Sequence, residues 1–101
     1  MFSIKPLPEF TAWLEGLTDR VTAQRLNVRL RKAMLCNLGD VKPVGKGGKG
    51  VFEMREHFGP GWRMYYVQRG AVLIVMLGGG DKSTQAADIT KAVKRAATLE
   101  E

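Results

Sequence analysis

Three cationic side chains lie near the ends of apolar runs, where together they could bind one phosphate group. Arg55 and Arg63 lie on either side of the segment Phe58-Gly59-Pro60-Gly61, and Lys82 follows three glycines. A segment of this composition is typical of a tight turn, so the two arginines are expected on neighbouring strands of a hairpin. Arginine can bind a phosphate through two parallel hydrogen bonds, and lysine adds a compact positive charge. The pattern therefore predicts a phosphate-binding surface.

Two side chains beside these cations could transfer protons. His57 lies two residues after Arg55, and Tyr65 lies two residues after Arg63. A spacing of two residues along a strand predicts that these side chains share one sheet face. Cleavage of RNA by its own 2′-hydroxyl needs a proton acceptor, cations that stabilise the phosphorane and an acid for the leaving 5′-oxygen. That reaction requires no metal. Charged residues on an open sheet face often do no more than face solvent, so alternation alone leaves both interpretations open.

A second set of cations could bind a nucleic-acid backbone farther from this surface. Lys46 and Lys49 lie in a glycine-rich segment, and Arg25 and Arg29 lie in an expected helix. The glycine-rich segment leads into a strand and has no Ser or Thr after either lysine, so it does not match a mononucleotide-binding loop. Each pair could instead form an ordinary solvated surface.

Composition narrows the choice of partner and of chemistry. The chain has 101 residues, enough for one domain, and a net charge of +6 that favours an anionic partner. Its one histidine and one cysteine cannot build a common zinc site, and no nucleophile elbow is present. We therefore expect no metal and no cofactor. The single Cys36 predicts a small core residue in a reducing compartment.

Localisation is predicted from the apolar runs. The longest one, Ala71 to Leu77, is far too short to cross a bilayer, and the first residues lack the apolar region of a secretory signal. We expect a cytoplasmic protein without a membrane partner.

Hydrophobic periodicity predicts the order β-α-α-β-β-β-α. The strands are expected at 2–7, 51–58, 62–68 and 71–77, and the helices at 9–17, from about 19 to 37, and at 83–99. Residues 40–50 are expected as a loop. The result is an α+β domain spanning residues 1–101, with an antiparallel sheet of about four strands, a helical hairpin and a C-terminal helix. We expect the helices on one sheet face and the side chains of Arg55, His57, Arg63 and Tyr65 on the other, at least partly open face.

Three segments together resemble the HigB-like toxins of the RelE/ParE superfamily, also labelled addiction module killer proteins. They are Glu53-Met54-Arg55, Phe58-Gly59-Pro60-Gly61-Trp62-Arg63-Met64-Tyr65 and Gly79-Gly80-Asp81-Lys82 followed by Gln85. The resemblance extends over nearly the whole chain. It implies a fold like that of small microbial ribonucleases. It also implies that Arg63 contacts the scissile phosphate, with Arg55 and Lys82 as further basic residues of the site.

The same resemblance implies a function. HigB-like toxins are ribosome-dependent endoribonucleases, or mRNA interferases, that cleave mRNA in the ribosomal A site and inhibit translation. They are neutralised by a co-encoded antitoxin, typically a HigA-like helix-turn-helix protein. No tyrosine follows Tyr66, whereas well-studied RelE toxins have one near the C-terminus, so the general base stays open between His57 and Tyr65. The alternative is a ParE-like inhibitor of DNA gyrase without nuclease activity.

Overall fold

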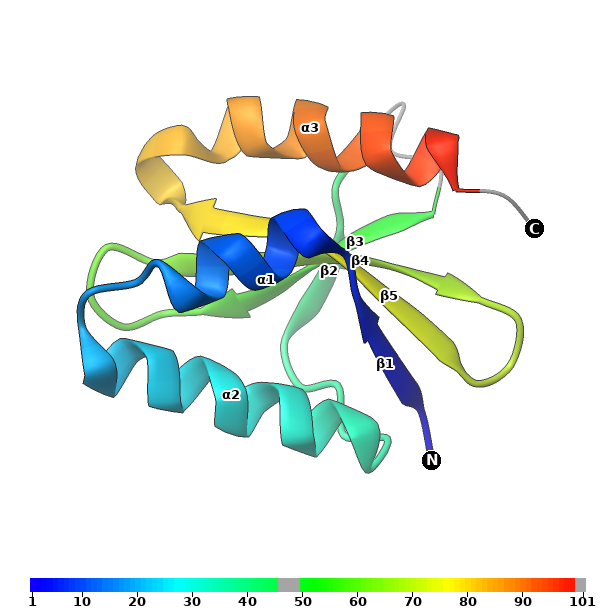
Figure 1. Cartoon of the computed structure of the whole chain (residues 1–101), viewed down its shortest axis with the longest axis horizontal. Helices are drawn as coiled ribbons and strands as arrows, with labels where there is room; N and C mark the ends of the chain where they lie inside the picture. The colour runs from blue at the N-terminus through cyan, green and yellow to red at the C-terminus, as the bar shows by residue number, and fades with distance from the viewer. Residues whose placement is uncertain (46–49, 100–101) are drawn as a thin grey trace.

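A five-stranded sheet with helices on both of its faces organises the described part of the chain (Figure 1). The computed structural model describes residues 1–45 and 50–99. The elements are β1 (Ser3–Pro6), α1 (Pro8–Glu15), α2 (Arg20–Met34), β2 (Val41–Pro43), β3 (Val51–Glu56), β4 (Trp62–Arg69), β5 (Leu73–Asp81), the 3₁₀ turn η1 (Lys82–Thr84) and α3 (Gln85–Thr98). The predicted α+β class is confirmed. None of the described helices is long and apolar enough to cross a membrane.

The strands lie in the order β1-β5-β4-β3-β2. All neighbouring pairs are antiparallel except β1 and β5, which run parallel with Ser3 opposite Leu73. A parallel neighbour requires a crossover, and the long path through β2, β3 and β4 provides it. β1 is an edge strand, as Pro6 predicted.

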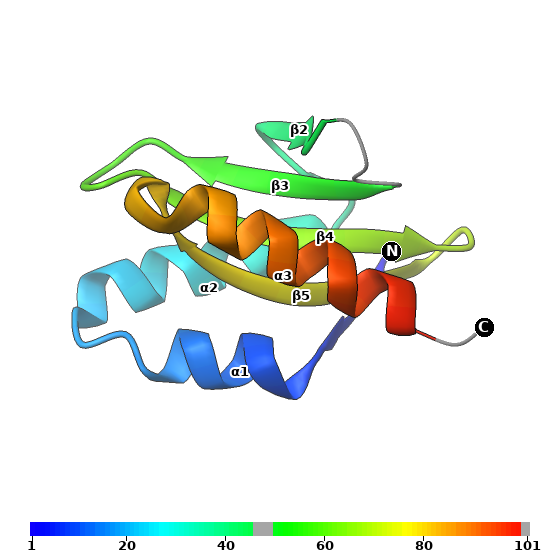
Figure 2. The same ribbon diagram turned by 90° about the horizontal axis from the view of Figure 1, so that it is seen from above.

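The two sheet faces carry separate hydrophobic cores. One core joins α1 and α2 to the sheet through residues that include Phe10, Leu26, Met64 and Met76. The other lies under α3 and includes Tyr65, Val67, Val75, Leu77 and Ala92. Figure 2 shows α3 crossing one side of the sheet while α1 and α2 lie on the other.

The prediction of one partly open sheet face was therefore wrong. Residues Ile74 to Leu77 of β5 are all buried, because helices cover this strand from both sides. A run of consecutive apolar residues is typical of such a doubly covered strand. The apolar run thus indicated cover on both faces of β5, whereas all the helices, including α3, were predicted on the face opposite Arg63 and Tyr65.

The start of α2 lies where the sequence predicted it, whereas its end does not. The Asp19 side chain caps its first turn, with Oδ1 accepting a hydrogen bond from the Val21 amide at 3.0 Å. The helix ends at Met34, earlier than the predicted residue 37, and the Met34 carbonyl accepts a hydrogen bond from the Phe2 amide. Cys36 follows with a φ of 69° and is exposed, so its predicted place in the core was wrong.

One strand was missed because its only signal is long-range. Val41–Pro43 was expected within a loop, yet β2 pairs antiparallel with β3 and sets Val41 opposite Met54. Three residues that include a proline show no alternation from which a strand could be predicted. Hydrogen bonds at both ends of this pairing, from the Arg55 amide to the Asp40 carbonyl and from the Val44 amide to the Val51 carbonyl, complete the edge.

The three glycines of β5 belong to the strand, not to its end as predicted. β5 continues through them to Asp81. A Cβ atom on Gly79 would lie 2.4 Å from the ring of Trp13 in α1, and one on Gly80 would lie 2.0 Å from the Asp88 carboxylate in α3. The glycines are therefore explained by close approach of helices on both faces, not by a turn.

We expect the substitution Gly79→Ala to destabilise the fold by about 1–3 kcal/mol, because the added methyl group overlaps the Trp13 ring. Urea unfolding monitored by circular dichroism measures the change. The double variant Gly79→Ala/Trp13→Phe, which has a smaller ring, should recover part of the loss. An unchanged unfolding midpoint for Gly79→Ala alone would contradict the packing described for this strand.

Candidate active site

The sheet brings the three predicted cations to one end of β3, β4 and β5. Arg55 of β3 and Arg63 of β4 are direct cross-strand partners, which places their Cβ atoms roughly 5 Å apart. Gly61 lies between Arg63 and Lys82, since a Cβ atom there would lie 3.1 Å from Lys82 Cδ and 3.7 Å from Arg63 Nη1. We call Arg55, Arg63 and Lys82 the cation cluster.

Arg63 is the most unusual member of this cluster. It is only 5% exposed. Its Nη1 donates a hydrogen bond to the Trp62 carbonyl at 3.0 Å, while its buried Nε has no hydrogen-bond partner within the described ranges. No carboxylate there forms an ion pair with it either. A buried guanidinium with an unused donor would gain stabilisation from an anionic ligand.

Asp40 connects two of the predicted site residues. Its Oδ1 accepts a hydrogen bond from Arg55 Nη2 at 2.9 Å, and its Oδ2 lies 2.6 Å from His57 Nε2. The Arg55 guanidinium, and then His57, lower the pKa of the Asp40 carboxyl group from 3.8 to about 2. Asp40 thus orients the exposed imidazole of His57 beside the cation cluster.

Tyr65 lies under α3 and not on an open surface. It is fully buried, and its hydroxyl group has no hydrogen-bond partner among the described residues. Burial raises the pKa of this hydroxyl group, and the nearby carboxylates of Glu53 and Asp88 raise it further. A deprotonated Tyr65 is therefore strongly disfavoured, which weakens its expected role as a general base.

A buried polar contact joins the sheet to α3 next to Tyr65. Glu53, the cross-strand partner of Tyr65, is 4% exposed and accepts a hydrogen bond from Gln85 Nε2 at 3.1 Å. Arg55, two residues along the same strand, forms its ion pair with Asp40 and not with Glu53. No role was predicted for Asp40 or Gln85 from the sequence, since their contacts depend on strand pairing and on the position of α3.

The residues predicted to bind RNA have very different surroundings. Arg29 is buried, and its guanidinium donates hydrogen bonds to the carbonyl groups of Leu38, Asp40 and Arg55 and forms an ion pair with Glu56. Its predicted availability to RNA was therefore wrong. Arg25 is exposed, with its guanidinium carbon 3.8 Å from the centre of the Phe58 ring. The predicted sites at Lys46 and Lys49 lie outside the described residues.

The fold and this site define a small basic α+β domain with a cluster of cations at one end of its sheet. The chain belongs to the family of phage-derived Gp49-like proteins, whose family pattern matches residues 12–99. This family is associated with toxin–antitoxin addiction modules, which supports a toxin role and implies a cognate antitoxin.

The chain is also similar to one curated protein over nearly its whole length. The chain is 38% identical over 89 residues to an uncharacterized protein of Haemophilus influenzae, and the match covers 88% of this chain and 87% of that protein. No solved structure matches the chain.

The resemblance to HigB-like toxins of the RelE/ParE superfamily was wrong, because the matching Gp49-like family is a different one. The three segments on which the resemblance rested combine turn glycines with alternating strand residues. Both features are common in antiparallel sheets, so they are not specific to one family. The gyrase-inhibitor alternative came from the same superfamily and loses its basis.

The pKa of Asp40 predicts a pH dependence of stability. A carboxyl group whose pKa is lowered by folding stabilises the native state above its unfolded pKa of 3.8, and this contribution is lost as the pH falls towards 2. We expect Asp40→Asn to be less stable than the wild type at pH 7, with the difference shrinking between pH 4 and 2. Urea midpoints measured across this range test the prediction, and a difference that is constant with pH would contradict it.

Proposed function

We propose that this toxin is an endoribonuclease that cleaves mRNA on the ribosome and thereby inhibits translation. The observation that carries the proposal is the cation cluster, and above all the buried Arg63 with its unused Nε donor. A scissile phosphodiester placed there would accept hydrogen bonds from Arg63, with Arg55 and Lys82 on either side of it. Clustered cations stabilise the extra negative charge of the phosphorane without a metal ion.

The proposed reaction is attack by the 2′-oxygen of the substrate on its adjacent phosphorus atom. A bond forms between the 2′-oxygen and phosphorus, and the bond from phosphorus to the 5′-oxygen breaks. The products are a 2′,3′-cyclic phosphate and a 5′-hydroxyl group. One proton leaves the 2′-hydroxyl group and one proton reaches the 5′-oxygen, so at least one proton-transferring side chain is needed.

We assign proton transfer to His57 and not to Tyr65. The His57 side chain is 65% exposed and is oriented by Asp40 at a distance of 2.6 Å. A neutral imidazole has one nitrogen that can accept a proton and one that can donate a proton, as a proton-transfer step requires. Tyr65 is covered by α3, and its hydroxyl group has a raised pKa. It supports the site as a packed residue.

The small number of functional groups in this site supports the proposed dependence on the ribosome. One imidazole and three cations offer charge stabilisation but few groups that could position a flexible RNA strand. Binding of mRNA in the A site would supply that orientation, which is worth several orders of magnitude in rate. Arg25, Arg31 and Lys32 are exposed on α2 and could contact ribosomal RNA.

The antitoxin is expected to be acidic, since the toxin has a net charge of +6. The HigA-like helix-turn-helix type rested on the overturned resemblance, and nothing in the fold requires it.

The central test is Arg63→Ala. We expect it to abolish growth arrest and to lower mRNA cleavage by about 10²–10³-fold, because the phosphorane loses its buried cation. Primer extension on a translated reporter mRNA after brief expression measures cleavage. A copy with a disabled start codon reports dependence on translation.

The matched control is Lys94→Ala, which removes an exposed lysine in the second half of α3 and should leave the cuts unchanged. Full toxicity of a folded Arg63→Ala protein would contradict the proposed site. Intact mRNA in cells arrested by the wild type would contradict the nuclease itself.

The assignment of His57 makes a separate prediction. We expect His57→Ala to slow cleavage by about 10²–10⁴-fold, whereas Tyr65→Phe should stay within a few-fold of the wild type because only a buried hydroxyl group is lost. Cleavage rates measured on translating ribosomes with each purified variant compare the two. The reverse order of effects would assign proton transfer to Tyr65.

A further inference from the structure

The proposed cleavage moves two protons, and His57 accounts for only one of them. One proton leaves the 2′-hydroxyl group and another reaches the 5′-oxygen. In an in-line displacement these two oxygens lie on opposite sides of the phosphorus atom. A second proton-transferring side chain is therefore needed on the side of the phosphate that faces away from His57.

A carboxylate from α3 lies beside Arg63 on that side. Arg63 on β4 has two cross-strand partners, Arg55 on β3 and Gly80 on β5. Gly80 has no side chain, and a Cβ atom there would lie 2.0 Å from Oδ2 of Asp88. The Asp88 carboxylate therefore occupies the place that a side chain of β5 would take. Because cross-strand Cβ positions are roughly 5 Å apart, a phosphate bound by Arg63 would lie within reach of this carboxylate.

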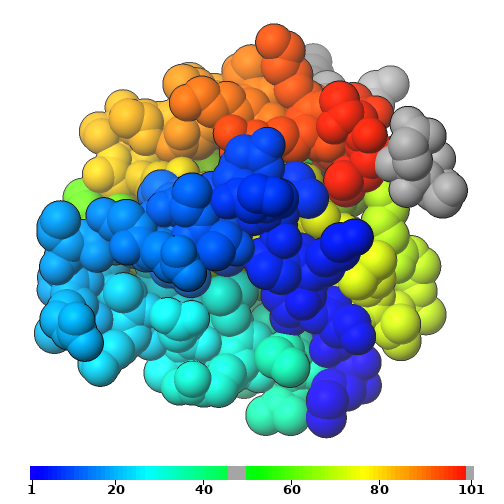
Figure 3. Space-filling view, in the orientation of Figure 1, coloured from blue at the N-terminus to red at the C-terminus, as the bar shows by residue number. Residues whose placement is uncertain are grey.

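The Asp88 carboxylate is oriented but only partly satisfied. Its Oδ2 accepts a hydrogen bond from Thr84 Oγ1 at 2.6 Å. Within the described ranges its Oδ1 accepts no hydrogen bond, and the carboxylate forms no ion pair. Asp88 is half-buried, and Figure 3 shows the start of α3 at the molecular surface. An ionised carboxylate in this setting can accept a proton from a bound substrate.

His57 and Asp88 lie on opposite sides of Arg63. His57 follows β3 and contacts Asp40, which directly precedes the edge strand β2. Asp88 lies over β5, which is the neighbour of β4 on the other side. A phosphate bound by Arg63 would therefore have an imidazole on one side and a carboxylate on the other, as an in-line displacement requires.

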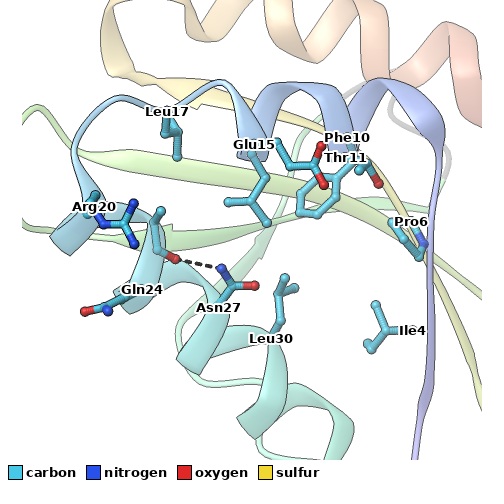
Figure 4. A pocket seen from close by; sticks show the side chains of 12 residues that line it. Ile4, Pro6, Phe10, Thr11, Glu15, Leu17, Arg20, Gln24, Asn27 and Leu30 are labelled. Atoms are coloured by element: carbon cyan, nitrogen blue, oxygen red, sulfur yellow. Dashed lines mark hydrogen bonds between the residues drawn. The ribbon is translucent and has the colours of Figure 1, made fainter.

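Other carboxylates of the chain are less suited to this role. Glu53 is only 4% exposed, lies one row deeper under α3 and already accepts a hydrogen bond from Gln85. Asp81 follows Gly80 along β5 and so faces the other side of the sheet. Glu15 lines the groove between α1, α2 and β1, which also lies on that other side (Figure 4).

We propose that Asp88 is a second catalytic residue, which accepts the proton of the 2′-hydroxyl group while His57 donates a proton to the 5′-oxygen. The bond between the 2′-oxygen and phosphorus forms as Asp88 takes up the proton. The bond to the 5′-oxygen breaks as that oxygen receives a proton from protonated His57. Nδ1 of His57 faces the substrate, since its Nε2 lies 2.6 Å from Asp40. Proton exchange with water restores both side chains, and this inference rests on the proposed nuclease function.

The test compares Asp88→Asn with the wild type in single-turnover cleavage of mRNA on purified translating ribosomes. Asparagine keeps the size of the side chain and can still accept the hydrogen bond from Thr84, but it cannot take up the proton. We expect cleavage to slow by about 10²–10⁴-fold. The matched control is Glu9→Gln, which removes an exposed first-turn carboxylate of α1 and should leave the rate unchanged. Circular dichroism confirms that each variant is folded.

A second substrate separates the two proton transfers. An mRNA with sulfur in place of the bridging 5′-oxygen has a leaving group that needs no proton. We expect this substrate to restore fast cleavage by His57→Ala but not by Asp88→Asn, because the 2′-hydroxyl group must still lose its proton. Hydroxide must then act as the base, so the rate of Asp88→Asn should rise about tenfold per pH unit, whereas the wild-type rate should rise much less.

The results that would overturn the proposal can be told apart. A wild-type rate for folded Asp88→Asn would remove Asp88 from the reaction and leave the nuclease intact. Rescue of Asp88→Asn instead of His57→Ala by the sulfur substrate would exchange the two roles. A loss of rate by the same factor at every pH would reduce Asp88 to a structural residue of α3. No cleavage by the wild type would overturn the nuclease itself.

Discussion

The close approach of helices to both faces of β5 is the constraint on which the rest of the structure depends. Gly79 makes room for Trp13 of α1, and Gly80 makes room for Asp88 of α3. Any side chain at these positions would force one of the helix layers away from the sheet. The same packing places α3 over Tyr65 and carries the chain through η1 so that Lys82 comes beside Arg63. The packing that forms the core therefore also brings the residues of the cation cluster together.

A second buried contact sets the other side of the site. The Arg29 side chain extends from α2 to the segment that follows this helix, where it donates hydrogen bonds to the carbonyl groups of Leu38 and Asp40. It also donates a hydrogen bond to the carbonyl group of Arg55. A guanidinium can satisfy several acceptors in fixed directions, which lysine cannot do. Its charge is balanced by Glu56, so its burial leaves no unpaired ion. This contact holds Asp40 where its carboxylate can reach both Arg55 and His57.

The charges of the site are balanced unequally. Arg55 has a carboxylate partner in Asp40, whereas Arg63 has none among the described residues. Two neighbouring arginines and a lysine repel one another, so the arrangement costs stability in the free protein. A phosphate ligand would remove that cost. An imperfectly satisfied cluster of this kind is a recurrent property of functional sites, where binding and not folding supplies the missing interaction.

Local sequence by itself determined the elements that depend on short-range physics. Alternation predicted one sheet face for Arg55 and Arg63, and the Phe58–Gly61 turn placed them on neighbouring strands. Asp19 and Asp81 accept hydrogen bonds from the amides of Val21 and Ser83, two residues further along the chain. Only the tertiary structure decided what covers each face. Burial of Tyr65 and Arg29, the pairing of β2 and the bridge through Asp40 all depend on elements distant in sequence. A residue's alternation or helical period specifies its side of an element, but the packing of other elements decides whether that side meets solvent, a helix or a ligand.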